Sequence, residues 1–390
     1  MTAVLEEPTL PPIISYEVTD YGWRGLTEEG CVFEVRSANG HKPTVPETIL
    51  EKHRGETLGR REVTNRYPFV ISKYVEHYDK AVVRFQQNQY EEALAGFEAA
   101  LDCAPTAAAK FNRGLVMLSL GYWPEGFAPY EARLDLMTPP MCRNIDLPRW
   151  RGEPIAGKRL LLVHDAGYGD TIMMLRYVPV LLERGADVHL LVPPELARLA
   201  SQVAPVYANS IRAIEADFFC PMLSLLHLLG QTIESIPNGP YLHVDRALVA
   251  KWQHQLDNDK KKIGVAWSVG RTVEGDYPRA APLAQMVAAI PGAEVHSVQT
   301  QGVDEAAKLG VITHSFKDFA DCAAFMHCMD EIVTVDTAAA HVAGAIGHPD
   351  VTLWLSYWAS WRWYNNPFYP DFKLLRQMHP DDWSIMLADR

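Results

Sequence analysis

Cysteine is scarce in this sequence, and the few cysteines are too scattered to build a metal site or a disulfide framework. The six residues are Cys31, Cys103, Cys142, Cys220, Cys322 and Cys328. No two of them form the CxxC pair that zinc sites and redox motifs commonly use. We therefore expect no bound metal and reduced thiols, as in an intracellular protein.

Basic residues and long apolar runs are also in short supply. The chain has 36 Lys and Arg against 48 Asp and Glu, a formal net charge of −12, so it repels nucleic acid and anionic membrane surfaces. No window approaches the ~20 apolar residues of a membrane-spanning helix, and residues 1–12 lack the basic and apolar regions of a signal peptide. We expect a cytoplasmic protein without a membrane span or a nucleic-acid partner; the sequence leaves a homo-oligomer open.

The apolar content that is present suffices for several folded domains. The 390 residues are 48% apolar, which favours two to four domains. Residues 1–70 are punctuated by prolines and contain one candidate strand, Cys31–Val35. The fold of this N-terminal segment is unknown from the sequence.

A helical pattern with an internal repeat follows. Tyr90 aligns with Trp123, and Phe97 with Tyr130, at a common offset of about 33 residues, close to the ~34-residue tetratricopeptide (TPR) period. In such repeats, aromatic and small residues form a seam between stacked helix pairs. We predict a short TPR-like helical segment over 71–145; two ordinary amphipathic hairpins are the alternative.

The periodicity then changes to that of alternating strands and helices. Arg159–His164 and Asp187–Val192 are short apolar strands, with a helix from about Thr171 to Arg184 between them. A second region supplies four more strands, namely Ile263–Trp267, Glu294–Val298, Glu331–Val335 and Val351–Leu355. Strand–helix–strand units form parallel sheets, so we expect two Rossmann-like domains, 150–245 and 246–390. The cleft between them is the expected place for chemistry.

A loop with two glycines, Gly167 and Gly169, joins the first of these strands to its helix. Glycines let a ligand approach the backbone, and a helix N-terminus attracts anions. NAD binding is disfavoured, because Ile172 stands where the GxGxxG pattern needs its third glycine. Asp170 has two interpretations: an N-cap of the helix, which Asp forms well, or a general base at the mouth of the cleft.

Two further groups of residues are placed to bind an anion. Asp336 and Thr337 end a buried strand and begin a helix of small residues, which brings the positive helix end near a diphosphate. We expect Asp336 to cap this helix; His341 lies one turn inside it, and a lone helical histidine is usually a core residue rather than part of a site. Arg271 and Arg279 follow the first strand of the second domain and suit a diphosphate, since arginine stays charged and forks onto phosphate oxygens. Two solvent-exposed arginines are the alternative.

The C-terminal region concentrates aromatic residues. Nine aromatic side chains fall within the nineteen residues from Trp354 to Phe372. Such density is typical of core or domain-interface packing. We expect a structural role, with sugar stacking left to one or two rings.

These pieces occur in an order that resembles a known family. The motifs are Trp150-Arg-Gly152, Gly167-Tyr-Gly169-Asp170-Thr-Ile, Arg176-Tyr177, Val265-Ala-Trp267, Asp318-Phe-Ala-Asp321, Val335-Asp-Thr-Ala-Ala-Ala-His341-Val-Ala-Gly344, Trp361-Arg-Trp363 and Tyr369-Pro370. Together they resemble bacterial tetratricopeptide-repeat glycosyltransferases, whose catalytic half is similar to the heptosyltransferase family. More distantly, the layout is similar to that of protein O-GlcNAc transferase. The resemblance covers roughly residues 75 to 390.

The resemblance implies a GT-B fold and an inverting, metal-independent transfer of a sugar from a nucleotide-sugar donor to an acceptor hydroxyl. The nucleotide sugar is then a co-substrate and no cofactor is expected; the acceptor is a protein docked by the TPR-like segment or another molecule. By position, Asp170 is the catalytic base. Asp336, Thr337 and His341 correspond to the family's binding site for the donor diphosphate and nucleotide. Arg279 corresponds to a phosphate-binding position.

The sequence departs from the family pattern at three alanines: Ala166, Ala280 and Ala338. These differences leave the donor open, together with two other functions. One is a catalytically inactive GT-B/TPR scaffold that binds proteins, and the other is a sugar-nucleotide epimerase with the same fold.

Overall fold

The structure, a computed structural model, falls into two compact units, residues 1–141 and 142–390. It describes the backbone of 13–19, 22–27 and 32–36, and residues 71–136, 145–208, 214–269 and 279–388. The first unit begins with an antiparallel sheet of order β1-β2-β3, formed by Ile13–Thr19, Gly22–Thr27 and Val32–Arg36. The predicted strand at Cys31–Val35 is therefore present, shifted by one residue.

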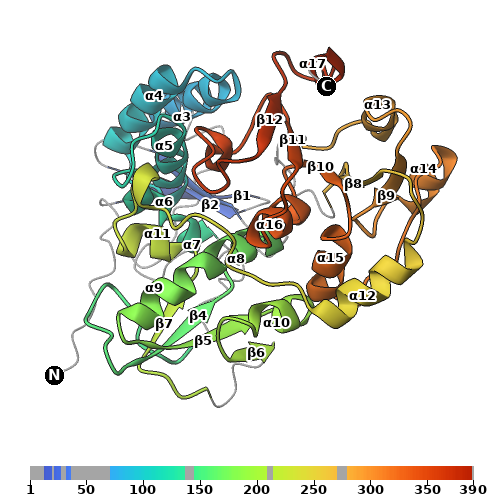
Figure 1. The fold of residues 1–390 in the computed structure, drawn as a ribbon. Coiled ribbons are helices and arrows are strands. Elements are labelled where there is room, and N and C mark those ends of the chain that lie inside the picture. The colour runs from blue at the N-terminus through green and yellow to red at the C-terminus, as the bar shows by residue number, and fades with distance from the viewer. Residues whose placement is uncertain are drawn as a thin grey trace. The chain divides into compact units, whose positions relative to one another are not determined.

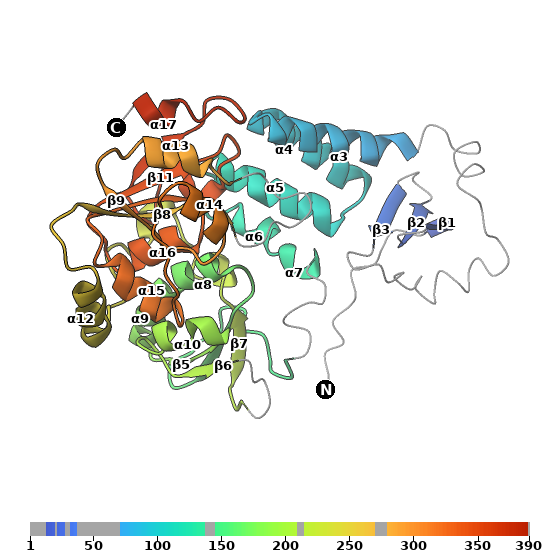
Figure 2. The same ribbon diagram turned by 90° about the vertical axis from the view of Figure 1, so that its right-hand side faces the viewer.

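Helices make up the rest of the described first unit. They are α3 (Ile71–Gln86), α4 (Tyr90–Cys103), α5 (Ala107–Ser119), α6 (Phe127–Tyr130) and α7 (Arg133–Leu136). Helices α3 and α4 lie side by side (Figure 2), and Gly96 permits this approach, because a Cβ there would be 2.8 Å from Ala81 Cβ. Phe97 and Tyr130, two of the aligned aromatics, are both buried. The predicted helices are thus present, whereas their assignment to the tetratricopeptide class stays a prediction.

The second unit contains two parallel α/β lobes. The first lobe, residues 145–235, holds a four-stranded parallel sheet of order β6-β5-β4-β7 (Figure 1). Its strands are β4 (Arg159–Val163), β5 (Asp187–Val192), β6 (Val206–Ala208) and β7 (Phe218–Pro221). Leu160, Leu161 and Leu162 are fully buried, which explains why β4 lies inside the sheet.

One predicted helix of this lobe is interrupted. The sequence indicates a single helix from about Thr171 to Arg184; instead α8 (Tyr168–Met174) passes through a 3₁₀ turn, η1 (Leu175–Tyr177), into α9 (Val178–Glu183). Pro179 explains the break, because it has no N–H to donate to the carbonyl of Leu175. The remaining helices of the lobe are α10 (Pro194–Ala200), α11 (Ser224–Leu228) and the turn η2 (Ile233–Ser235).

The second lobe, residues 246–388, holds a five-stranded parallel sheet of order β12-β11-β10-β8-β9. Its strands are β8 (Lys262–Ala266), β9 (Glu294–Ser297), β10 (Glu331–Val335), β11 (Val351–Leu355) and β12 (Lys373–Arg376). Four match the predicted strands; β12 is additional. Its helices are α12 (Arg246–Gln255), α13 (Leu283–Ala288), α14 (Val303–Lys308), α15 (Phe319–Met326), α16 (Ala338–Ala345) and α17 (Ile385–Ala388).

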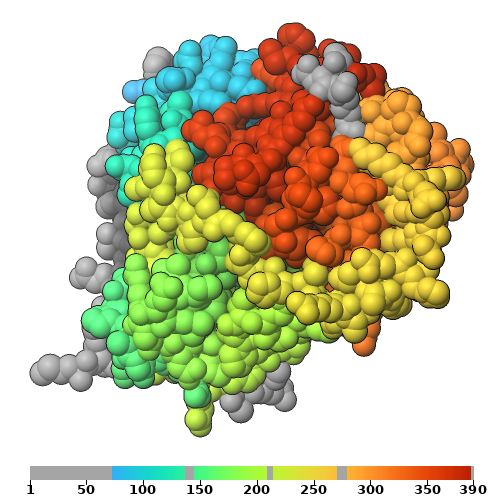
Figure 3. All heavy atoms as spheres, viewed as in Figure 1, coloured from blue at the N-terminus to red at the C-terminus, as the bar shows by residue number. Residues whose placement is uncertain are grey.

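The segment between η2 and α12 connects the first lobe to the second. In Figure 3 the segment after η2, drawn in yellow, runs over the surface from the first lobe to the second. The N–H groups of Tyr241 and Leu242 both donate to the carbonyl of Ala345, each at 3.0 Å, and so attach this segment to the end of α16. No helix in the described part of the chain has the length and apolar character that crossing a membrane requires.

Candidate functional site

Four charged side chains follow the carboxyl ends of strands in the two sheets of the second unit. Asp170 lies in α8, after β4, whereas Arg279, Asp336 and Arg362 follow β8, β10 and β11. The last three strands are neighbours in one parallel sheet, so the segments that follow them emerge at the same edge. Helices α8 and α16 pack directly against each other and bring the two edges together (Figures 1 and 2).

Asp170 is held from both lobes. Its Oδ2 accepts a hydrogen bond from Gly167 N–H at 3.1 Å, and its Oδ1 lies 2.5 Å from Nη2 of Arg362. Gly167 is the N-cap of α8, so Asp170 is its third residue; the carboxylate reaches back to the cap rather than forming it. Burial alone would raise the pKa of Asp170, but the Arg362 guanidinium, together with His341, the Gly167 N–H and Arg279, outweighs burial and holds that pKa below its usual value.

Asp336 lies beside the second arginine. Arg279 Nη1 is 3.9 Å from Asp336 Oδ2 and donates to the Asp336 carbonyl at 3.4 Å. Burial raises the pKa of the Asp336 carboxyl, an effect that Arg279 opposes. The expectation that Asp336 caps α16 is wrong: Thr337 is the N-cap residue, without a side-chain capping bond, and its hydroxyl lies 3.2 Å from that of Thr334.

His341 is buried inside this group. Its Nδ1 lies 3.1 Å from the hydroxyl of Tyr369, and its ring packs against Trp363. Burial lowers the pKa of His341 to about 3, so the imidazole is uncharged at neutral pH. A Cβ on Gly169 would be 2.5 Å from His341 Cδ2, so the glycine lets α8 contact this ring closely.

The structure thus brings most of the predicted site residues together. Asp170, Arg279, Asp336 and His341 are close enough for their charges to interact, and Thr337 adjoins Asp336 at the start of α16. Gly167 and Gly169 are explained by capping and packing of α8. Arg271 lies outside the described residues. Among those described, no group of three or more His, Cys, Asp or Glu is placed to hold a metal ion.

Sequence reasoning missed the role of Arg362. It lies in η3 (Trp361–Trp363), with its guanidinium 4.7 Å from the centre of the Trp361 ring and Nη1 donating to Ser360 Oγ at 3.0 Å. The aromatic segment was expected to be structural, and Trp361 and Trp363 are indeed buried. The available signal was a single arginine between two tryptophans.

Arg176 also connects the two lobes and was missed. It is 2% exposed, and its Nη1 donates to the carbonyls of Pro237 and Phe368 at 3.1 and 3.0 Å. Its guanidinium lies 4.8 to 5.1 Å from the ring centres of Tyr241, Phe368 and Tyr369. An arginine within the otherwise apolar run Met173–Val178 was the sequence signal.

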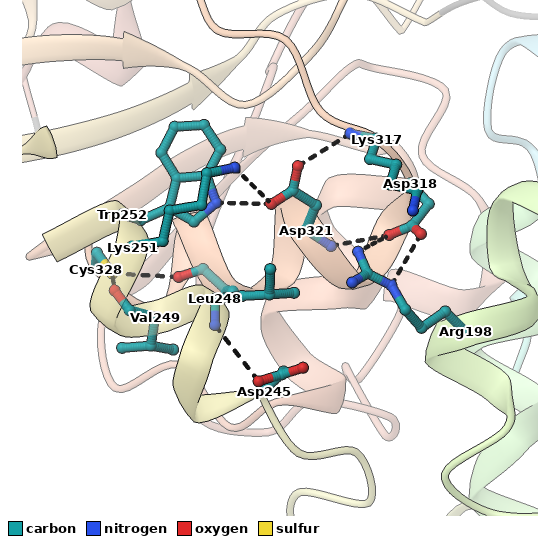
Figure 4. Close-up of polar contacts among 11 residues, drawn as sticks. Arg198, Asp245, Leu248, Val249, Lys251, Trp252, Lys317, Asp318, Asp321 and Cys328 are labelled. Atoms are coloured by element: carbon teal, nitrogen blue, oxygen red, sulfur yellow. Dashed lines mark hydrogen bonds and ion pairs between the residues drawn. The ribbon is translucent and has the colours of Figure 1, made fainter. Parts of the chain in front are cut away.

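A third connection lies on the α10 side of the lobes. Arg198 on α10 donates two hydrogen bonds to Asp318, Nε to Oδ2 at 2.9 Å and Nη2 to Oδ1 at 2.6 Å (Figure 4). Asp318 is the N-cap of α15 and accepts from Asp321 N–H at 3.0 Å. The Asp321 carboxylate in turn accepts from the Trp252 indole and from Lys317 N–H, which ties α12 to α15.

Comparison with known proteins gives the following similarities. No family model matches the chain. It is 27% identical over 351 residues to Protein FlbA of Caulobacter vibrioides, covering 79% of this chain and 59% of FlbA, so it spans little more than half of that relative.

Solved structures of glycosyltransferases are similar to parts of the chain. One is the glycosyl transferase family 9 protein of Veillonella parvula, with a TM-score of 0.43 and 11% identity over 59% of this chain and 88% of that one. Another is the ADP-heptose LPS heptosyltransferase II of E. coli, with a TM-score of 0.43 and 13% identity over 59% and 94%. The O-GlcNAc transferase of Thermobaculum terrenum has a TM-score of 0.28 and 11% identity over 84% of each chain. Similarity at this level leaves the activity to be inferred from the site.

Proposed function

We propose that the protein is a glycosyltransferase of GT-B type, which moves a sugar from a nucleotide-sugar donor to an acceptor hydroxyl with inversion and without a metal. One observation carries the proposal. A carboxylate from one parallel α/β lobe, Asp170, lies beside cationic side chains that follow the strands of the other lobe, Arg279 and Arg362.

The donor binds mainly to the second lobe. Arg279 and the backbone N–H groups at the start of α16 face the diphosphate, and the small residues Ala338 to Ala340 let it approach that helix end. Negative charge builds on the nucleoside diphosphate as it leaves. Fixed donors in a partly buried site stabilise this charge most where it develops, in the transition state.

Asp170 is the general base. The acceptor oxygen forms a bond to the anomeric carbon as the bond from that carbon to the phosphate oxygen breaks, and the acceptor proton passes to Asp170. The side chain of Asp170 remains 23% exposed, which leaves an approach for the acceptor hydroxyl. We assign the acceptor to a protein docked by the helices α3–α5, in line with the TPR-like repeat.

The test combines binding with transfer. A nucleotide sugar that binds the native state raises its stability, by about 2.7 kcal/mol at a hundredfold excess over Kd. We expect a thermal shift with one of the UDP, GDP, CDP or ADP sugars, and we expect Asp170→Asn to keep that shift while abolishing transfer. Asp187→Asn, which alters an exposed carboxylate of the same lobe, serves as the matched control.

Each alternative gives a different result. A protein that responds to none of these nucleotides or sugars is a scaffold rather than a transferase. Conversion of the donor without acceptor identifies an epimerase. Transfer by the Asp170→Asn variant at a rate near wild type removes Asp170 as the base.

A further inference from the structure

The ion pair between Asp170 and Arg362 joins the proposed base to the opposite lobe. Their nearest atoms are 2.5 Å apart, and the two side chains are 23% and 15% exposed. Removing one partner of so enclosed a pair leaves the other uncompensated, at a large cost. A base that is paired in this way is also a weak one, since the guanidinium stabilises the charged carboxylate.

Arg362 is positioned by its own lobe rather than by Asp170. Its Nη1 donates to Ser360 Oγ at 3.0 Å, and its guanidinium lies over the Trp361 ring. Asp170 is the partner that arrives from the other lobe. The guanidinium therefore remains directed into the site when a different anion takes the place of the carboxylate.

The charges of the site leave room for such an anion. Arg279 and Arg362 are cationic, Asp170 and Asp336 are the facing carboxyls, and His341 is uncharged at neutral pH. A diphosphate adds negative charge, and the two carboxylates repel it. It therefore binds well only if the guanidinium groups of the arginines bond to its phosphate oxygens. A guanidinium fork fits phosphate oxygens as well as carboxylate oxygens, so diphosphate and Asp170 compete for Arg362.

We infer that Arg362 is a ligand of the donor diphosphate, and that donor binding takes Arg362 away from Asp170 and so releases the base. This inference rests on the glycosyltransferase function proposed above. No covalent bond changes in the exchange: Arg362 gives up its contact with Asp170 Oδ1 and donates to a phosphate oxygen instead. The base is freed only when a donor is present, so the donor binds productively before the acceptor loses its proton.

The exchange makes an unusual prediction about affinity. Arg362→Met weakens binding of the diphosphate by about tenfold or more, because a charged hydrogen bond is lost. Asp170→Asn strengthens it by several-fold, because the competing carboxylate is gone. In the double variant, the gain from Asp170→Asn disappears, since there is no longer an Arg362 to release.

The experiment is calorimetric titration of the purified full chain with ADP, CDP, GDP, UDP and inorganic pyrophosphate at fixed ionic strength. Arg198→Met is the matched control: it also removes an arginine–carboxylate pair between the lobes, but at α10 and α15, and leaves diphosphate affinity near wild type. Arg362→Lys keeps the charge without the fork and falls between Arg362→Met and wild type. Thermal unfolding checks that each variant is folded.

The outcomes separate this inference from the proposed function. If a diphosphate binds and the affinity is unchanged in Arg362→Met, or unchanged or lower in Asp170→Asn, the exchange is wrong while the transferase proposal stands. If the gain from Asp170→Asn persists in the double variant, the competition does not act through Arg362. If no diphosphate binds the wild type, both are overturned.

Discussion

Gly169 of α8 lies directly against His341 of α16, so close that a Cβ on the glycine would be 2.5 Å from Cδ2 of the histidine. The ring cannot withdraw easily, because it is buried and contacts Tyr369 and Trp363. This contact sets how near the two helices come. It therefore sets how near Asp170, one residue further along α8, comes to the arginines of the second lobe.

The first prediction concerns this contact. Gly169→Ala inserts a methyl group into a filled space, and we expect a loss of about 1–3 kcal/mol in the free energy of unfolding. Urea denaturation measures it. In a His341→Ala background the same change should cost much less, since the ring that it meets is gone. Equal costs in both backgrounds would place the strain elsewhere.

The outcome for Gly169 shows what the sequence could and could not reveal. The two glycines of the loop predict that a ligand approaches the backbone there, and the structure gives Gly169 a packing role that depends on His341, far along the chain. The approach of Asp170, Arg279 and Asp336, by contrast, was predictable. The strand–helix–strand order predicts that both sheets are parallel. In a parallel sheet, the segments that follow the strands all emerge at the same edge.

The parts that were missed depend on how the lobes meet. Arg176 and Arg362 are each bound by groups from the opposite lobe, and no local pattern encodes such partners. The interruption of the helix before Pro179 was also missed, although the sequence contains its signal: proline inside a helical pattern removes a hydrogen-bond donor. Strand β12 could not be predicted in this way, since Lys373–Arg376 is short and has a charged residue at each end.

The second prediction concerns Arg176. Its Nη1 donates to the carbonyls of Pro237 and Phe368. Its Nε donates to the carbonyl of Met173, and a lysine, with one nitrogen and no fork, cannot occupy both donor positions. We expect Arg176→Lys to lower the free energy of unfolding by about 1–3 kcal/mol. Arg184→Lys, at an exposed position of the same lobe, should change it by less than about 0.5 kcal/mol. Similar small effects for both variants would show that the fork is dispensable.

The third prediction concerns pH. Burial lowers the pKa of His341 from 6.5 to about 3, so the unfolded chain takes up a proton between these values that the folded chain excludes. Stability therefore falls as the pH drops below 6.5, by at most about 1.4 kcal/mol per pH unit from this group. The groups that face His341 are Asp170, which favours the proton, and Arg176, Arg279 and Arg362, which oppose it.

A variant isolates that contribution. His341→Asn cannot titrate, so its free energy of unfolding should fall less steeply than that of the wild type between pH 6.5 and 4.5. Urea denaturation at several pH values gives both slopes. Burial also lowers the pKa of His314, to about 4, and this residue contributes equally to both proteins. Equal slopes for the two proteins would mean that His341 takes up its proton between pH 6.5 and 4.5 in the folded state as well.

The last prediction separates the two roles of Asp318, which caps α15 and pairs with Arg198 (Figure 4). Burial would raise the pKa of Asp318, but the hydrogen bonds from Arg198 and from α15 hold it below its usual value. Asp318→Asn keeps a capping oxygen and loses the ion pair, whereas Asp318→Ala loses both. We therefore expect Ala to cost about 1 kcal/mol more than Asn. The difference between Asn and wild type should shrink in high salt, because Arg198 is 38% exposed, while the difference between Ala and Asn should not. If Ala and Asn are equally stable, the carboxylate acts only through Arg198, and α15 begins without its help.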